Sequence, residues 1–193
     1  MTSIMYLADT VVTMNAHNDV LTGGALLVTD KTIEAVGDAL SLKACYPGAT
    51  VVNLDRTLLM PGLVNTHCHS GLLRGTAEGL PVWAWLQQYI DPMHRVILAD
   101  EAALASRLCY AEALLSGTTT IVDMWRHMHG SAEAAENLGI RAVLVPYVAE
   151  HPDHDYFETL DANEQLIADW HQRRSDRISV WVCLLYTSDA ADE

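Results

Sequence analysis

The chain has 193 residues, half of them hydrophobic, and a formal net charge of −14 with a pI near 4.8. Such a chain buries a sizeable core, and its acidic balance argues against nucleic acid or an anionic membrane surface as a partner, because both need a basic face. No apolar run reaches the roughly 18 residues of a membrane span and no secretory pattern opens the chain, so we expect a cytoplasmic protein. The four cysteines lack CxxC spacing, so we expect them to be reduced thiols. A small-molecule substrate fits the acidic charge better than a polyanion does.

Short β-branched runs fill the first part of the chain and predict strands at residues 10–13, 25–28, 32–36 and 50–54. Turn-forming residues stand between these runs, among them Gly23-Gly24 and Pro47-Gly48. We therefore predict that residues 1–58 form a small antiparallel sheet, which needs another layer to pack on.

After Pro61-Gly62, strands alternate with helical stretches. Strands are predicted at residues 63–67, 118–123, 141–148 and 178–182. Helices are predicted from an N-cap at Asp100 to Gly117, from an N-cap at Ser131 to Gly139, and over residues 158–173. Repeated βα units with apolar strands indicate an α/β protein with a parallel sheet covered by helices, and a doubly wound sheet and a (β/α)8 barrel both remain candidates.

The strongest local signal is the His-x-His pair that ends the first of these parallel strands, in the sequence Met60-Pro61-Gly62-Leu63-Val64-Asn65-Thr66-His67-Cys68-His69. Residues i and i+2 of a strand share a face, so His67 and His69 should present two imidazoles on one side and Cys68 should face the other. Neutral imidazole is the commonest protein ligand for zinc and a good one for iron. The carboxyl end of a barrel strand is also where barrel enzymes build their sites. We predict a metal site, exposed at the rim of the sheet, with two ordinary polar residues at a strand end as the alternative.

Residues 183–193 read Cys-Leu-Leu-Tyr-Thr-Ser-Asp-Ala-Ala-Asp-Glu. This stretch resembles the translation of a transposon-end sequencing adapter, which predicts that native sequence ends near Val182. An ordinary acidic C-terminus is the alternative.

The chain resembles the amidohydrolase superfamily, and within it the group of 5-methylthioadenosine/S-adenosylhomocysteine deaminases and chlorohydrolases. The resemblance rests on ordered motifs: the His-x-His segment, Leu72-Leu73-Arg74-Gly75, Leu80-Pro81 with Trp85-Leu86, and Ser116-Gly117-Thr118-Thr119-Thr120 followed by Asp123-Met124. It implies a (β/α)8 TIM barrel, truncated here after about four strands, beside a small N-terminal β-sandwich segment. The expected divisions are residues 1–58, residues 59–182 and the non-native tail 183–193.

By the same resemblance, His67 and His69 would be the first two ligands of one divalent metal, zinc in the first place and iron as the alternative. The other ligands and the proton-transferring groups would lie beyond this chain, so the chain by itself should be inactive. The implied reaction is deamination of a purine, pyrimidine or related cyclic amidine by metal-activated water. Removal of chloride by the same chemistry and a catalytically inactive relative are the alternatives. We expect the full-length protein to be a homo-oligomer.

Two positions depart from the nucleoside deaminases. Where those enzymes carry a glutamate that accepts hydrogen bonds from ribose hydroxyls, this chain has His94, which we predict to bind substrate. Where they carry a substrate-contacting arginine, this chain has Pro146. Asp123 could line the pocket or cap a neighbouring helix or loop. Solvated side chains are expected for four further histidines: His127, His129, His151 and His154.

Overall fold

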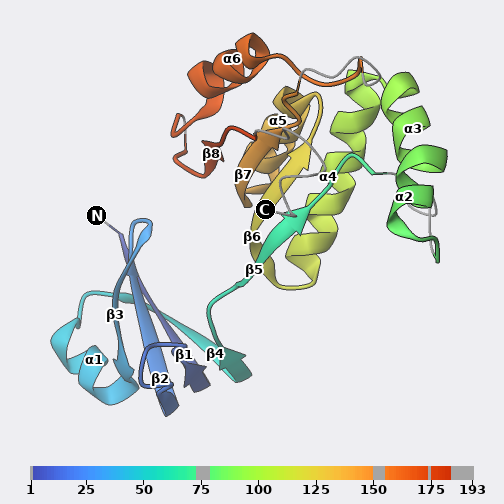
Figure 1. Cartoon of the computed structure of the whole chain (residues 1–193). Coiled ribbons are helices and arrows are strands. Elements are labelled where there is room, and N and C mark those ends of the chain that lie inside the picture. The colour runs from blue at the N-terminus through green and yellow to red at the C-terminus, as the bar shows by residue number, and fades with distance from the viewer. Residues whose placement is uncertain (1, 73–78, 150–154, 174, 184–193) are drawn as a thin grey trace. The chain divides into compact units, whose positions relative to one another are not determined.

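The computed structural model describes residues 2–72, 79–149, 155–173 and 175–183 (Figure 1). The chain divides into two compact units, Met1–Pro61 and Gly62–Glu193. The expected division after residue 58 falls at the end of a strand that runs to Leu59. Leu73, Arg74 and Gly75 of the sequence motif lie outside the described residues, as do His151 and His154 and the predicted tail apart from Cys183.

The first unit is a four-stranded sheet of order β3-β2-β1-β4. Its elements are β1 (Ser3–Val12), β2 (Val20–Thr29), β3 (Thr32–Asp38), α1 (Ala39–Cys45) and β4 (Thr50–Leu59). The prediction of an all-antiparallel sheet is wrong for one pair, because β4 runs parallel to β1. The helix α1, which was not predicted, explains this: Asp38 caps it by accepting from the Ser41 N–H at 2.8 Å, and it allows the chain to cross over before β4.

The second unit is a parallel sheet of order β5-β6-β7-β8. Its strands are β5 (Leu63–Cys68), β6 (Thr118–Trp125), β7 (Arg141–Pro146) and β8 (Ile178–Val180), and its helices are α2 (Val82–Trp85), the π-helical turn η1 (Leu86–Ile90), α3 (Asp91–Val96), α4 (Ala99–Leu115), α5 (Met128–Leu138) and α6 (Leu160–Trp170). Helix α4 packs on β6, α5 on β7 and α6 on β8. The predicted βα alternation and the α/β fold class are therefore confirmed (Figure 1).

Two predicted N-caps are wrong. Helix α4 has its N-cap at Leu98, because the Glu101 carboxylate accepts from the Leu98 N–H at 2.9 Å and so satisfies a donor before Asp100. Helix α5 begins at Met128, so that Ser131 is an interior, buried residue whose hydroxyl lies 2.9 Å from the Ser106 hydroxyl of α4. Both helices start earlier in the chain than the sequence pattern indicates.

A helical excursion, α2–η1–α3, leaves the sheet after β5 and was not predicted as helix. Its π turn lies just before Pro92. Proline has no N–H to donate to the carbonyl four residues back, so regular α-helical hydrogen bonding is interrupted there. The Asp91 N–H bonds instead to the Leu86 carbonyl, five residues back. The excursion positions Asp91 and His94 for the site described below.

The buried core of the second unit lies between the parallel sheet and its helices. Strand residues Ile121, Leu144 and Ile178 pack there with helix residues such as Ala135 and Leu166. In the described part of the chain, no helix combines the length and the hydropathy that crossing a membrane requires.

Candidate functional site

The end of β5 contains one extra residue relative to β6. Asn65 pairs with Ile121, but the next pairing is Cys68 with Asp123, so three steps along β5 match two along β6. This irregularity is a bulge, a device that redirects side chains and is common beside active sites. The Asn65 side-chain oxygen accepts from the His67 N–H at 3.1 Å, which satisfies a backbone donor at the bulge.

His67 and His69 lie together at this end of β5. Their ring centroids are 4.7 Å apart and the rings are nearly perpendicular, at 87°. Cys68 faces helix α4, where its sulfur lies 3.6 Å from that of Cys109. The predicted geometry of two imidazoles on one side and the thiol on the other is confirmed. His67 is exposed as predicted, but His69 is half-buried, because neighbouring aromatic residues cover it.

The ring of His69 is fixed by its Nδ1 atom. This nitrogen lies 2.8 Å from the Met124 carbonyl oxygen and 2.9 Å from the Tyr147 hydroxyl. A carbonyl oxygen only accepts, so we assign the proton to Nδ1, which leaves the lone pair on Nε2. Metal-binding histidines are held in this way, with the second ring N–H donated to a carbonyl or carboxylate. The donor chemistry of His69 therefore fits a metal ligand.

The described residues supply no group of three or more His, Cys, Asp or Glu side chains arranged to hold a metal. His67 and His69 thus form a pair of candidate ligands with no third such ligand from the described part of the chain. Two imidazoles carry no negative charge to balance a divalent cation, so a stable site needs further ligands.

His94, on α3, lies in a cluster of aromatic rings. Its ring stacks on Tyr156 at 4.6 Å and 5° and packs on Trp125 at 4.4 Å. Only 2% of the residue is exposed, and neither ring nitrogen has a hydrogen-bond partner among the described residues. Burial first, and then the positive charge of Arg126, lowers the pKa of His94 to about 4. His94 is therefore a neutral, buried imidazole, and its predicted contact with substrate remains a prediction.

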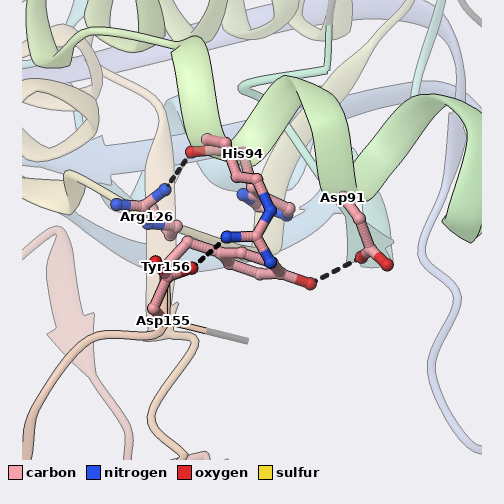
Figure 2. Close-up of polar contacts among 6 residues, drawn as sticks. Asp91, His94, Arg126, Asp155 and Tyr156 are labelled. Carbon is pink, nitrogen blue, oxygen red and sulfur yellow. Dashed lines mark hydrogen bonds and ion pairs between the residues drawn. The ribbon is translucent and has the colours of Figure 1, made fainter. Parts of the chain in front are cut away.

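Polar contacts hold the rings around His94 in place (Figure 2). The Tyr156 hydroxyl donates to the Asp91 carboxylate at 2.6 Å. The Arg126 guanidinium donates to the His94 carbonyl and also lies over the Tyr156 ring, with its central carbon 5.7 Å from the centroid. Burial lowers the pKa of Arg126 from its ordinary value.

Trp125, the last residue of β6, lies close to both His69 and His94. Its ring is completely buried and lies 6.4 Å from the His69 ring as well as against His94. Gly71 runs so close that a Cβ there would lie 1.6 Å from the indole nitrogen, and only glycine fits such an approach. Trp125 and Tyr147 were not predicted as site residues. Their position at or just after the end of a parallel strand is the signal that could have found them.

Asp123 is completely buried and so does not line an open pocket. Its carboxylate accepts hydrogen bonds from Ser70, in the loop after β5, and from Tyr110 of α4. Burial raises the pKa of Asp123, and these hydrogen bonds oppose the rise. Of the two roles expected from the sequence, the structure supports the capping of a neighbouring loop. Of the two described histidines expected to be solvated, His129 is exposed as predicted, although its ring accepts from the Trp170 indole at 3.2 Å. His127 is half-buried, and its backbone N–H donates to the Glu158 carboxylate at 2.9 Å.

The chain is similar to known proteins over most of its length. The family model described as amidohydrolase family matches residues 58–184. A 5-methylthioadenosine/S-adenosylhomocysteine deaminase of Syntrophobacter fumaroxidans is 35% identical over 162 residues, which cover 81% of this chain and 37% of that protein. A 5'-deoxyadenosine deaminase of Methanococcoides burtonii is 32% identical over 173 residues, 88% of this chain and 39% of that protein. The chain thus spans about 40% of the length of the curated relatives it matches.

Solved structures show the same fold. An adenosine deaminase from Xanthomonas campestris with bound zinc superposes with a TM-score of 0.76 at 26% identity, over 94% of this chain and 42% of that one. An atrazine chlorohydrolase from Arthrobacter aurescens superposes with a TM-score of 0.76 at 21% identity, over 93% and 46%, which shows likeness of fold alone. The fold is that of the (β/α)8 barrel expected from the family resemblance, and β5 to β8 are four of its strands. The chain belongs to the amidohydrolase family.

Proposed function

We propose that the whole protein that carries this chain is a metal-dependent aminohydrolase, which hydrolyses a carbon–nitrogen bond of a purine, pyrimidine or related cyclic amidine. The observation that carries the proposal is the pairing of His67 and His69 at the carboxyl end of β5, with Nδ1 of His69 bonded to the Met124 carbonyl. The likeness to deaminases named for adenosine derivatives supports the reaction class.

In this proposal His67 and His69 hold one divalent cation, zinc rather than iron. When bound, the cation supplies Lewis-acid activation of water near neutral pH. The protein's own contribution is orientation: the Met124 carbonyl and the Tyr147 hydroxyl fix the ring of His69, so that Nε2 keeps its lone pair for the cation. Burial raises the pKa of Tyr147, so its phenol stays neutral beside the imidazole.

The aromatic cluster around His94 bears on the proposed substrate class. Trp125 and Tyr156 pack on the His94 ring and are themselves buried, so the cluster is an apolar support that excludes water from the carboxyl end of the sheet. His94 is neutral and buried at the position where the nucleoside deaminases carry a glutamate, so the two acceptor oxygens that would receive hydrogen bonds from a ribose diol are missing. We therefore propose a free base or another small heterocycle in preference to a nucleoside.

The experiment is metal analysis and ammonia release on the whole protein, tested with free heterocyclic bases and with their nucleosides. His67→Ala should abolish metal retention and turnover together, because one of only three or four ligands is lost. His17→Ala is the matched control, since His17 is an exposed histidine of the first unit. Normal metal content and a normal rate in His67→Ala would refute the assignment. The domain divisions, the cytoplasmic location and the homo-oligomeric state remain predictions.

A further inference from the structure

Asp123 lies at the point where β6 pairs with β5 for the last time, opposite Cys68. Its carboxylate is fully buried and receives three hydrogen bonds. The Ser70 N–H donates at 2.8 Å, the Ser70 hydroxyl at 2.5 Å, and the Tyr110 hydroxyl at 2.5 Å. Two of these three bonds come from one residue, so the carboxylate fixes both the backbone and the side chain of Ser70.

The Ser70 hydroxyl is also the end of a chain of buried hydroxyl groups. Ser131 of α5 lies 2.9 Å from Ser106 of α4, and Ser106 lies 2.7 Å from Ser70. Each hydroxyl donates one proton. Because Ser70 donates to Asp123, Ser106 must donate to Ser70 and Ser131 to Ser106. The chain of bonds runs from α5 through α4 to the carboxylate on β6, and it holds Ser70 from both sides.

Ser70 follows His69 directly in the chain, and Met124 follows Asp123. The Met124 carbonyl accepts from the His69 ring, while the Asp123 carboxylate accepts from Ser70. Two successive residues of β6 therefore hold two successive residues after β5. The ladder itself does not fix this segment, because the bulge between Asn65 and Cys68 interrupts its register.

We propose that Asp123 is a positioning residue for the metal-binding end of β5, which sets the direction of His69 by fixing Ser70. The inference rests on the proposed function, because it assumes that His67 and His69 bind a cation. Asp123 is bonded to the segment next to the proposed ligand, and acts through it. Partners of this kind typically change metal affinity by about 10- to 100-fold when they are removed.

The test compares Asp123→Asn with Tyr110→Phe in the whole protein. The asparagine has nearly the same size, but its amide NH2 cannot accept from Ser70 or Tyr110, so one or two of the three bonds are lost. Tyr110→Phe removes one bond to the same carboxylate and keeps both bonds from Ser70. It therefore controls for the general cost of disturbing this buried network.

The probe is Co²⁺ alone, titrated into metal-free protein and followed by its visible absorption and by calorimetry. We expect Asp123→Asn to bind Co²⁺ about 10- to 100-fold more weakly and with an altered spectrum, while Tyr110→Phe binds it as the wild type does. Ser70→Ala, which keeps the backbone N–H bond to Asp123, should give an intermediate affinity and serves if Asp123→Asn does not fold. Wild-type affinity and spectrum in Asp123→Asn would overturn the inference and leave the proposed function intact. A wild-type protein that binds no Co²⁺ would overturn both.

Discussion

Replacing His94 by phenylalanine should remove an acid-dependent loss of stability from the protein. The pKa of His94 is lowered to about 4 from an ordinary value of 6.5, chiefly by burial and next by Arg126. His69 and His127 also face it and lower its pKa when charged, while Asp91 raises it. Between pH 6.5 and pH 4 the unfolded chain therefore binds a proton at this residue that the folded chain does not. The stability that neutral His94 contributes is present above pH 6.5 and is lost as the pH falls towards 4.

The magnitude follows from the separation of the two pKa values. Each pKa unit corresponds to about 1.36 kcal/mol, so a fall from 6.5 to about 4 corresponds to about 3 kcal/mol in full. At pH 5 the titration of the unfolded chain is nearly complete and about 2 kcal/mol should already be lost. A phenylalanine keeps the stacking on Tyr156 and Trp125 and leaves no buried ring nitrogen without a partner, so at pH 7 the variant should be at least as stable.

The assay is urea unfolding of the metal-free protein at pH 7, 6 and 5. Metal is removed because proton competition at its ligands would add a pH dependence of its own. Between pH 7 and pH 5, wild type should lose about 2 kcal/mol more free energy of unfolding than His94→Phe. His17→Gln, which removes an exposed histidine, should behave as wild type does. Equal losses in wild type and His94→Phe would show that His94 is not held neutral by its burial.

Two further substitutions test Gly71, which lies against Trp125, and Tyr147, which lies beside His69. Gly71→Ala should cost about 1–3 kcal/mol of stability and alter tryptophan fluorescence, because a Cβ there lies 1.6 Å from the Trp125 ring nitrogen. The control is Gly48→Ala, which should cost little stability because a Cβ there meets open space. Tyr147→Phe removes the hydroxyl beside Nδ1 of His69 and should weaken metal binding by about tenfold in a chelator competition. An unchanged metal affinity would mean that the Met124 carbonyl alone holds the ring.

The parts of the fold that sequence predicts well are those in which local pattern and tertiary packing agree. The alternation of strands and helices after Pro61 follows the hydrophobic periodicity, and the same-side placement of His67 and His69 follows from strand geometry. The bulge at the end of β5 leaves that placement intact. Pattern therefore predicted the candidate metal ligands without any knowledge of the surrounding site.

The α2–η1–α3 excursion was missed because its own signals conflict. Pro81 and Pro92 break the helical pattern, and the π turn between them shifts the spacing of side chains. Trp83 and Tyr89 are exposed, so they do not mark a buried helix face. The parallel pairing of β4 with β1 was missed for another reason, since strand direction depends on a crossover and not on the residues of either strand.

The aromatic cluster could not be predicted from the sequence because its members come together only in the folded chain. Trp125 ends β6, Tyr147 follows β7, and Tyr156 lies further along, yet all three rings contact His94, which comes from α3. No spacing rule links such positions. Topology does: parallel strands place their carboxyl ends at one edge of the sheet, so residues at successive strand ends become neighbours.

The end of β6 is the common support of both halves of the candidate site. Three successive residues each hold a different part: the Asp123 carboxylate fixes Ser70, the Met124 carbonyl fixes the His69 ring, and the Trp125 ring carries His94. Consecutive residues of one strand move together, so a displacement of this end would alter the proposed metal ligands and the packing of His94 at once. A change confined to α3 would instead alter stacking on Trp125 and leave the bonds to His69 in place. Substitutions at the end of β6 should therefore change metal affinity and substrate preference together, whereas substitutions on α3 should change substrate preference alone.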